Sequence, residues 1–168
     1  METHIAYISL GSNLGDKLGN CRRALEELAA DGAVRITACS RLYRTEPVDF
    51  TAQEWFINQV VQVETALGPM ALLDRLQAVQ RRLGRSEPAV RFGPRVIDLD
   101  MLLYDGLVLE EPRLSLPHPR MHLRRFVLQP LCDIDSNLIH PVLGREVRAL
   151  LAELDPDRQE VVEHPCCG

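Results

Sequence analysis

The chain has 168 residues, which fits one domain with a sizeable core, and its 46% hydrophobic and 26% charged residues are globular values. A net charge of −5 argues against a general binder of nucleic acid or of anionic membranes. No apolar stretch nears the length of a membrane span, and residues 1–4 lack the basic region of a signal peptide. We therefore expect one cytoplasmic, monomeric domain over residues 1–168.

The cysteines argue against a fold that is stabilised by disulfides or by a structural metal site. Their number, five, is odd, and none is spaced as a CxxC pair, so we expect neither a disulfide framework nor a zinc site. Free thiols in a reducing compartment are the expected state. Cys166 and Cys167 lie in residues 155–168, which we expect to form a loosely ordered tail.

The first half of the chain predicts, in order, a strand over residues 4–10, a helix to about residue 30, and strands over 33–45 and 56–66 with a loop over 46–55 between them. Asn13 or Asp16 can cap the helix, and Gly32 ends it.

The second half begins with a helix that Pro69 opens and Gly84 ends, with a buried stripe of Leu72, Leu73, Leu76, Val79 and Leu83. It continues with an Arg-rich loop, a strand over 96–104, a turn at 105–106, a short strand near 107–109, a loop over 112–119, and short helices over 124–134 and 145–154. The order β-α-β-β-α-β predicts an α+β, ferredoxin-like core, in which an antiparallel sheet carries two helices on one face. The extra C-terminal short strand and helices add to that core.

Two aspartates in the strand over 96–104 are the most informative residues. Asp98 and Asp100 point to the same side because side chains alternate along a strand, and Asp is disfavoured in strands. Mg²⁺ takes one or two carboxylates together with phosphate oxygens, which gives such a pair a reason. The alternative is an exposed edge strand whose aspartates form salt bridges.

Positive charge gathers near these aspartates. Residues 81–95 and 113–125 carry nine of the nineteen Lys/Arg residues, and only Glu87 opposes them there. A basic site on an acidic protein suits a small anionic ligand, and arginines beside a carboxylate pair suit a polyphosphate.

Three residues could hold a flat heterocycle. Phe56 and Phe126 could sandwich a ring, and Asn58 offers a donor and an acceptor to the ring's edge. The alternative for each phenylalanine is plain core packing. Trp55 is expected on the opposite face from Phe56.

The remaining candidates have equally plain alternatives. His118, fixed between two prolines, could bind phosphate or be a surface turn residue. The segment 11–13 could approach a ligand or only cap the first helix. Gln77 and Gln80 share a helix face that we expect to be solvent-exposed unless it lines the Arg-rich loop.

The motifs together resemble the 6-hydroxymethyl-7,8-dihydropterin pyrophosphokinase family, from about residue 6 to about residue 151. The similarity lies in Ile8-Ser9-Leu10-Gly11-Ser12-Asn13-Leu14-Gly15, Tyr43-Arg44-Thr45, Asn58, Gly93-Pro94-Arg95-Val96-Ile97-Asp98-Leu99-Asp100, Pro117-His118 and Arg124-Arg125-Phe126. Family members have an elaborated ferredoxin-like fold.

The resemblance implies transfer of a diphosphate from ATP to the pterin hydroxymethyl oxygen, with release of AMP, in folate biosynthesis. It implies two Mg²⁺ ions on Asp98 and Asp100. It implies a phosphate and nucleotide site of Gln77, Arg85, Phe92, Arg95, Arg113, Ser115, His118 and Arg124, with Arg85, Arg95 and His118 also taking part in catalysis. It implies a pterin site of Thr45, Val48, Phe56, Asn58 and Phe126.

This chain departs from the family pattern on the ATP side. Gln80 stands where the family usually has Glu, Phe92 where Trp is common, and Glu87 and Pro119 where known members have Arg and an aromatic residue. These departures bear on nucleotide affinity more than on the reaction. The alternative functions are a metabolite-binding module with structural aspartates, and a γ-phosphate kinase that releases ADP.

Overall fold

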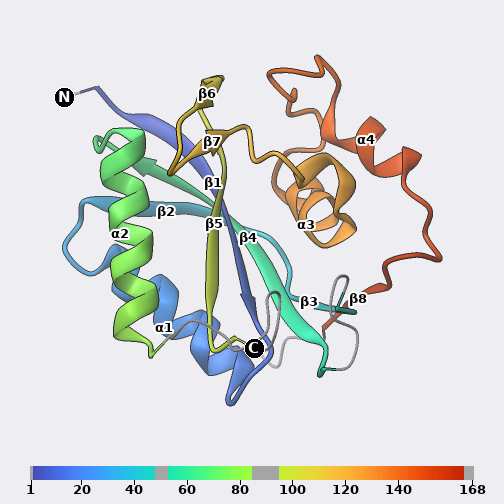
Figure 1. Cartoon of the computed structure of the whole chain (residues 1–168), viewed down its shortest axis with the longest axis horizontal. Coiled ribbons are helices and arrows are strands. Elements are labelled where there is room, and N and C mark those ends of the chain that lie inside the picture. Colours follow the sequence, from blue (N-terminus) through green and yellow to red (C-terminus); the bar gives the residue numbers. More distant parts are fainter. Residues whose placement is uncertain (1, 48–52, 85–94, 165–168) are drawn as a thin grey trace.

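The computed structural model describes residues 2–47, 53–84 and 95–164. In the first half it places β1 (His4–Ser12), α1 (Lys17–Ala29), β2 (Val34–Cys39), β3 (Tyr43–Thr45), β4 (Phe56–Thr65) and α2 (Pro69–Arg82) (Figure 1). The second half adds β5 (Asp98–Tyr104), β6 (Leu109–Glu110), β7 (Ser115–Leu116), the 3-10 helix η1 (Met121–Leu123), α3 (Arg125–Asp135), α4 (Val147–Glu153) and β8 (Val161–Glu163).

The main sheet is antiparallel and has the strand order β5-β1-β4-β3-β8, with β2 also paired to β4. This arrangement confirms the ferredoxin-like α+β prediction. The strand predicted over 33–45 is two strands, β2 and β3. The reason lies at Ser40, whose hydroxyl accepts the Val60 N–H at 2.9 Å while its own N–H donates to the Val60 carbonyl at 2.9 Å. The Ser40 hydroxyl thus accepts a hydrogen bond that a backbone carbonyl would accept in a regular sheet, and the regular pairing with β4 is interrupted at this residue.

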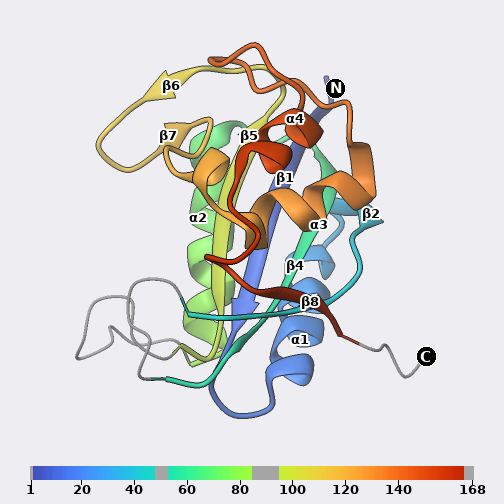
Figure 2. The same ribbon diagram turned by 90° about the vertical axis from the view of Figure 1, so that its right-hand side faces the viewer.

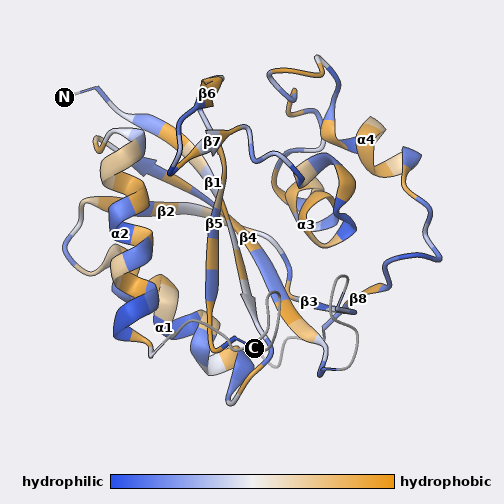
Figure 3. Cartoon of the chain, in the orientation of Figure 1, coloured by the Kyte–Doolittle hydropathy of each residue, from blue (hydrophilic) through white to orange (hydrophobic). Residues whose placement is uncertain are grey.

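The sheet has a helix layer on each side (Figures 1 and 2). Helices α1 and α2 cover one face, as predicted, and α3 and α4 cover part of the other. The α1/α2 side encloses the larger core, with Ile8, Leu10, Leu28 and Leu72 among its members. The smaller core lies under α3 and α4. The strand β5 between these layers alternates hydrophilic and hydrophobic residues in its first half and is hydrophobic over residues 101–103 (Figure 3).

The first two helices begin and end as the sequence predicts. Asp16 is the N-cap of α1, and its carboxylate accepts the Gly19 N–H at 3.1 Å. Pro69 is the first residue of α2. Gly84 follows α2 with a φ of 88°, a left-handed conformation that glycine adopts without strain. Leu72, Leu76 and Val79 of the predicted stripe are fully buried.

The C-terminal segment differs from the expected loose tail. Strand β8 pairs with β3, so that Val161 lies opposite Thr45 and Glu163 opposite Tyr43. The Arg125 guanidinium donates to the carbonyl oxygens of Pro156 at 3.1 Å and Gln159 at 2.7 Å. These bonds hold the chain that leads into β8. Cys166 and Cys167 lie outside the described residues.

Two smaller predictions also need correction. The short strand expected near 107–109 is β6 at Leu109–Glu110, and the segment 112–119 expected as a loop contains its partner β7. Within the described ranges, none of the helices is both long and apolar enough to cross a membrane.

Candidate active site

One face of the sheet changes from hydrophobic to polar along the neighbouring strands β1, β4 and β5. Tyr7, Val60 and Leu102 belong to the core under α3 and α4. Farther along the same strands, the sheet register places Gly11 of β1 between Asn58 of β4 and Asp98 of β5. Neighbouring strands lie about 4.8 Å apart, so the backbones at Asn58 and Asp98 are roughly 10 Å apart. That polar row forms the floor of a cavity.

The cavity has a volume of about 550 Å³. Its walls come from β1, β3, β4, β5, α2, the segment after β7 and the start of α3. The residues that line it include Ser9, Gly11, Thr45, Gln53, Phe56, Asn58, Gln77, Gln80, Arg95, Asp98, Asp100, Arg113, His118, Pro119, Arg120, Arg124 and Phe126. Most of the residues that the sequence singled out, from widely separated segments, therefore meet in one place.

The two aspartates line this cavity together, as the alternation along the strand predicts. Both are half-buried, whereas Leu99 between them is buried and belongs to the larger core. Arg95 approaches Asp98, with 3.4 Å between Nη1 and Oδ1. The salt-bridge alternative thus describes one contact of Asp98, but not the placement of both carboxylates in a cavity.

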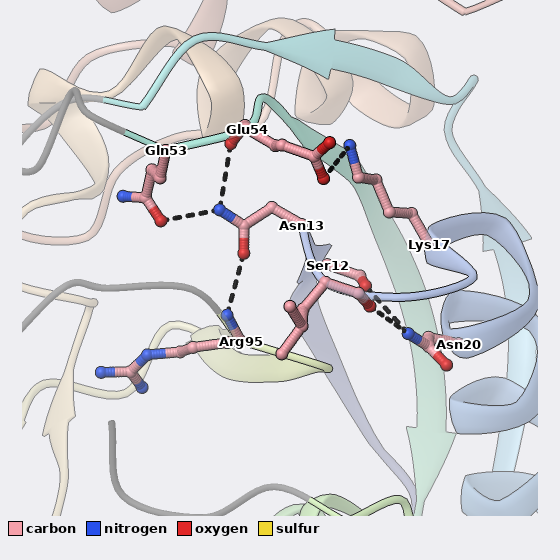
Figure 4. A network of polar contacts seen from close by, with 8 residues as sticks. Ser12, Asn13, Lys17, Asn20, Gln53, Glu54 and Arg95 are labelled. Atoms are coloured by element: carbon pink, nitrogen blue, oxygen red, sulfur yellow. Dashed lines mark hydrogen bonds and ion pairs between the residues drawn. The ribbon is translucent and has the colours of Figure 1, made fainter. Parts of the chain in front are cut away.

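Asn13 fixes the Arg95 end of the cavity (Figure 4). Its side chain is 1% exposed and joins three segments of the chain. Oδ1 accepts the Arg95 N–H at 2.8 Å, and Nδ2 donates to Gln53 Oε1 at 2.7 Å and to the Glu54 carbonyl at 3.0 Å. The capping alternative for Asn13 is wrong, because Asp16 is the N-cap. A position after the first strand was the only signal for this role.

The aromatic end of the cavity is built around Asn58. Asn58 is 5% exposed; its Oδ1 pairs with the Thr45 hydroxyl, and its Nδ2 donates to the Leu10 carbonyl at 3.3 Å. A Cβ at Gly11 would lie 2.7 Å from Asn58 Nδ2. Glycine is therefore needed at position 11 for close approach to the amide. Phe56 and Phe126 also line the cavity.

Trp55 lies apart from this end. Its ring stacks with the Arg44 guanidinium, 4.7 Å from the ring centroid, and it lines a separate surface pocket with Lys17 and Leu18 of α1. The expectation that Trp55 faces away from Phe56 is confirmed.

His118 is a half-buried residue of the cavity wall rather than a free surface residue. Burial is the main cause that lowers its pKa to about 4; Arg124 lowers it further, and Asp98 opposes the shift. Nδ1 accepts the Arg120 N–H at 3.1 Å. A neutral ring that accepts at Nδ1 carries its proton on Nε2, so Nε2 is a donor.

Helix α2 supplies two glutamines that differ in burial. Gln77 lines the cavity, and its Oε1 accepts from Arg113 Nη2 at 3.0 Å; Arg113 also pairs with Asp74 at 2.5 Å. Gln80 is 5% exposed, which corrects the expectation of solvent exposure. It is buried because α2 packs against the edge of β5, where Gln80 Oε1 accepts the Leu99 N–H at 2.8 Å.

Two neighbouring arginines at the start of α3 have separate environments. The Arg124 guanidinium lies 5.3 Å from the centroid of the Phe126 ring, and Arg124 lines the cavity. Arg125 points to the 156–159 segment instead.

One expected site residue that the structure describes is not brought to the cavity. Ser115 lies on β7, half-buried, and is not among the lining residues. Val48, Arg85, Glu87 and Phe92 lie outside the described residues. Within the described ranges, no group of three or more His, Cys, Asp or Glu side chains could hold a metal ion.

Comparison with known proteins agrees with this geometry. A relative from Methylorubrum extorquens, named 2-amino-4-hydroxy-6-hydroxymethyldihydropteridine pyrophosphokinase, is 44% identical over 158 residues, which cover 94% of this chain and 98% of the relative. A Bacillus subtilis protein of the same name is 44% identical over 131 residues, 78% of each chain.

The fold is also that of a solved structure. A crystal structure of a Plasmodium falciparum HPPK-DHPS variant matches with a TM-score of 0.70 at 16% identity; the match covers 90% of this chain and 45% of the other. This chain thus spans less than half of that solved chain. The model of the 7,8-dihydro-6-hydroxymethylpterin-pyrophosphokinase family matches residues 7–136. The chain belongs to this family.

Proposed function

We propose that this protein transfers a diphosphate from ATP to the hydroxymethyl oxygen of 6-hydroxymethyl-7,8-dihydropterin and releases AMP, a step of folate biosynthesis. The observation that carries the proposal is one cavity with two chemically distinct ends. Asp98, Asp100 and Arg95 form the charged end, and Phe56, Asn58 and Phe126 form the aromatic end. A polyphosphate and a flat heterocycle are the ligands that these two ends suit.

The pterin occupies the aromatic end in this proposal. Phe56 and Phe126 stack against its ring, and Asn58 bonds its edge, while Thr45 holds the amide of Asn58 in place. The amide oxygen and the amide nitrogen of Asn58 each have a protein partner, so the amide cannot rotate freely. A fixed amide distinguishes the donor and acceptor atoms of a pterin edge. We also assign Val48, which precedes β4 in the sequence, to the pterin site.

Asp98 and Asp100 fit two Mg²⁺ ions, since half-buried carboxylate oxygens on one wall are the hard donors that Mg²⁺ prefers. When bound, the ions neutralise charge on the triphosphate and on the transferring group. Asn13 holds the backbone of Arg95, and the Arg95 guanidinium lies 3.4 Å from the Asp98 carboxylate.

The other cationic and donor groups bind ATP. Arg124 and Arg113 contact its phosphates, and we assign Arg85 and Phe92 to the same nucleotide site. His118 donates from Nε2 as a neutral ring. Gln77 accepts a hydrogen bond from Arg113 at the nucleotide end. We assign Ser115, two residues after Arg113, to the same nucleotide site. We assign catalytic roles to Arg85, Arg95, Asp98, Asp100 and His118.

The attacking group is the substrate alcohol, so no enzyme nucleophile is needed. Catalysis then consists of holding the alcohol in line with the β-phosphorus and of stabilising the charge that develops on the phosphate oxygens. In this proposal, the cavity walls from β4 and α3 hold the two substrates in that in-line arrangement.

We further propose that the enzyme works as a cytoplasmic monomer. The cavity is built from a single chain, and among the described residues Cys21, Cys39 and Cys132 are free thiols, as a reducing compartment allows. Light scattering on the purified protein tests the monomer.

Identification of the nucleotide product tests the reaction. The protein is incubated with ATP, Mg²⁺ and 6-hydroxymethyl-7,8-dihydropterin, and the nucleotides are separated by chromatography. We expect AMP in a 1:1 ratio to pterin diphosphate. ADP would instead show γ-phosphate transfer, and absence of turnover would favour a binding module. Omission of Mg²⁺ should abolish AMP formation.

A further inference from the structure

The strand that carries both aspartates is an edge strand. In the described sheet β5 pairs with β1 and is the last strand on that side. Backbone groups on the outer side of an edge strand have no strand partner. Leu99, between the aspartates, is 5% exposed, so an N–H without a partner here would be costly.

Gln80 of α2 supplies that partner. Its Oε1 accepts the Leu99 N–H at 2.8 Å, and the side chain is 5% exposed. The orientation of the amide follows from chemistry, because an N–H donor can be met only by the oxygen. A helix side chain thus replaces a neighbouring strand at one residue of β5.

The contact lies where it can act on the aspartates. Asp98 and Asp100 are the two residues bonded to Leu99 along the chain, and Gln80 lines the same cavity as both of them. Farther along the same strand, the Leu102 carbonyl accepts the His118 N–H at 2.8 Å. At Leu99, the hydrogen bond that the backbone N–H donates to Gln80 ties the strand to α2.

We propose that Gln80 is a positioning residue for the metal-binding carboxylates. It fixes the backbone at Leu99 and thereby sets the spacing and direction of Asp98 and Asp100, while its neutral amide adds no charge to the pair. This inference rests on the proposed function. Groups that hydrogen-bond a metal ligand directly typically change metal affinity or activity by about 10–100-fold. Gln80 acts through the backbone of the residue between the two ligands, so we expect an effect at the lower end of that range.

Two substitutions separate the hydrogen bond from the shape of the side chain. Gln80→Leu keeps most of the volume but removes the acceptor. Gln80→Glu keeps an acceptor oxygen in the same place and adds a negative charge. Gln62→Leu is the matched control, because Gln62 is a half-buried glutamine on β4 that donates to the Tyr7 hydroxyl at 2.8 Å and does not line the cavity.

The experiment measures Mn²⁺ binding, by electron paramagnetic resonance of free Mn²⁺, to full-length protein saturated with a non-hydrolysable ATP analogue. Hydrogen exchange at the Leu99 amide is followed in parallel. For Gln80→Leu we expect about tenfold weaker Mn²⁺ binding and faster exchange at Leu99. Gln80→Glu should keep slow exchange and bind Mn²⁺ at least as tightly as wild type. Gln62→Leu should match wild type.

Two results overturn the proposal. One is Gln80→Leu binding Mn²⁺ within about twofold of wild type. The other is Gln80→Glu losing Mn²⁺ affinity or Leu99 protection although its acceptor is intact, and this result decides the matter if Gln80→Leu does not fold. Wild-type protein that makes no AMP, or binds no Mn²⁺ with the analogue, refutes the proposed function instead.

Discussion

Along the α3 side of the sheet, the same strands build two regions with opposite properties. Leu102 is 1% exposed and lies in the core under α3 and α4, whereas Asp100, two residues earlier on β5, is half-buried in the cavity wall. On β4, Val60 belongs to that core, whereas Asn58, although also buried, lines the cavity. The packed end anchors the strands in the core, and the open end presents polar groups at spacings that the strand register determines. Stability and chemistry should therefore respond to different substitutions only two residues apart.

The largest difference between an effect on catalytic rate and an effect on stability is expected on β5. Asp98→Ala and Asp100→Ala should each lower the rate of AMP formation by at least about 100-fold, the scale of losing one electrostatic stabiliser of a transition state. The melting temperature of the ligand-free protein should stay the same or rise for Asp100→Ala, because the substitution removes the repulsion between the two carboxylates. For Asp98→Ala, loss of the Arg95 contact should cost no more than about 1 kcal/mol.

Leu102→Ala is the converse change on the same strand. It should lower the free energy of unfolding by about 2–5 kcal/mol because it leaves a cavity in the core. The rate per folded molecule, measured well below the melting temperature, should stay near wild type. An aspartate variant that keeps more than about a tenth of the wild-type rate would contradict the role of that carboxylate.

The next effect is expected at the aromatic end. Asn58→Ala and Phe126→Ala should each weaken pterin binding by roughly 1–3 kcal/mol, because ring polar atoms lose a partner or the ring loses a stacking face. Binding of a non-hydrolysable ATP analogue should change little. Calorimetry with each ligand tests the difference, and equal losses for both ligands would indicate unfolding rather than a local role.

Gly11→Ala should act on the same ligand more weakly. The new Cβ would lie 2.7 Å from Asn58 Nδ2 and 3.6 Å from a Phe56 ring carbon, so the amide must move. We expect a loss of pterin affinity on the order of 1 kcal/mol, measured by calorimetry. Gly106→Ala is the control, since a Cβ there meets no atom within 4 Å. Equal effects at both glycines would argue against a contact with Asn58.

The smallest effect concerns His118. Its pKa of about 4 lies below the ordinary 6.5, so the unfolded chain takes up this proton first as pH falls. Stability linked to this group is full above pH 6.5 and is lost as pH falls toward 4. NMR of the ligand-free protein should show no titration of the His118 ring between pH 8 and 5.5. A midpoint near 6.5 in the native protein would refute the buried, neutral ring.

The sequence predicts those parts of the site that depend on local alternation. Asp98 and Asp100 face one side because they are two residues apart on a strand. The sequence leaves the cap of the first helix open between Asn13 and Asp16, and the structure shows that it is Asp16. The burial of Gln80 could not be predicted, because it depends on where α2 meets the edge of β5. The role of Asn13 depends in the same way on segments far apart in the chain.

Strand β8 escaped prediction for a related reason, since three residues carry too short a pattern to indicate a strand. Its register on β3 places Val161 opposite Thr45, the residue that pairs with the amide of Asn58.

That pairing has a consequence for the order of folding. During synthesis the strands β1, β3 and β4 leave the ribosome well before residues 161–163, so the sheet can form while the outer edge of β3 is still open. The backbone beside Thr45 then gains its last neighbour only when the end of the domain arrives. We expect ligand recognition by the aromatic end to mature later in folding than the core beneath α1 and α2.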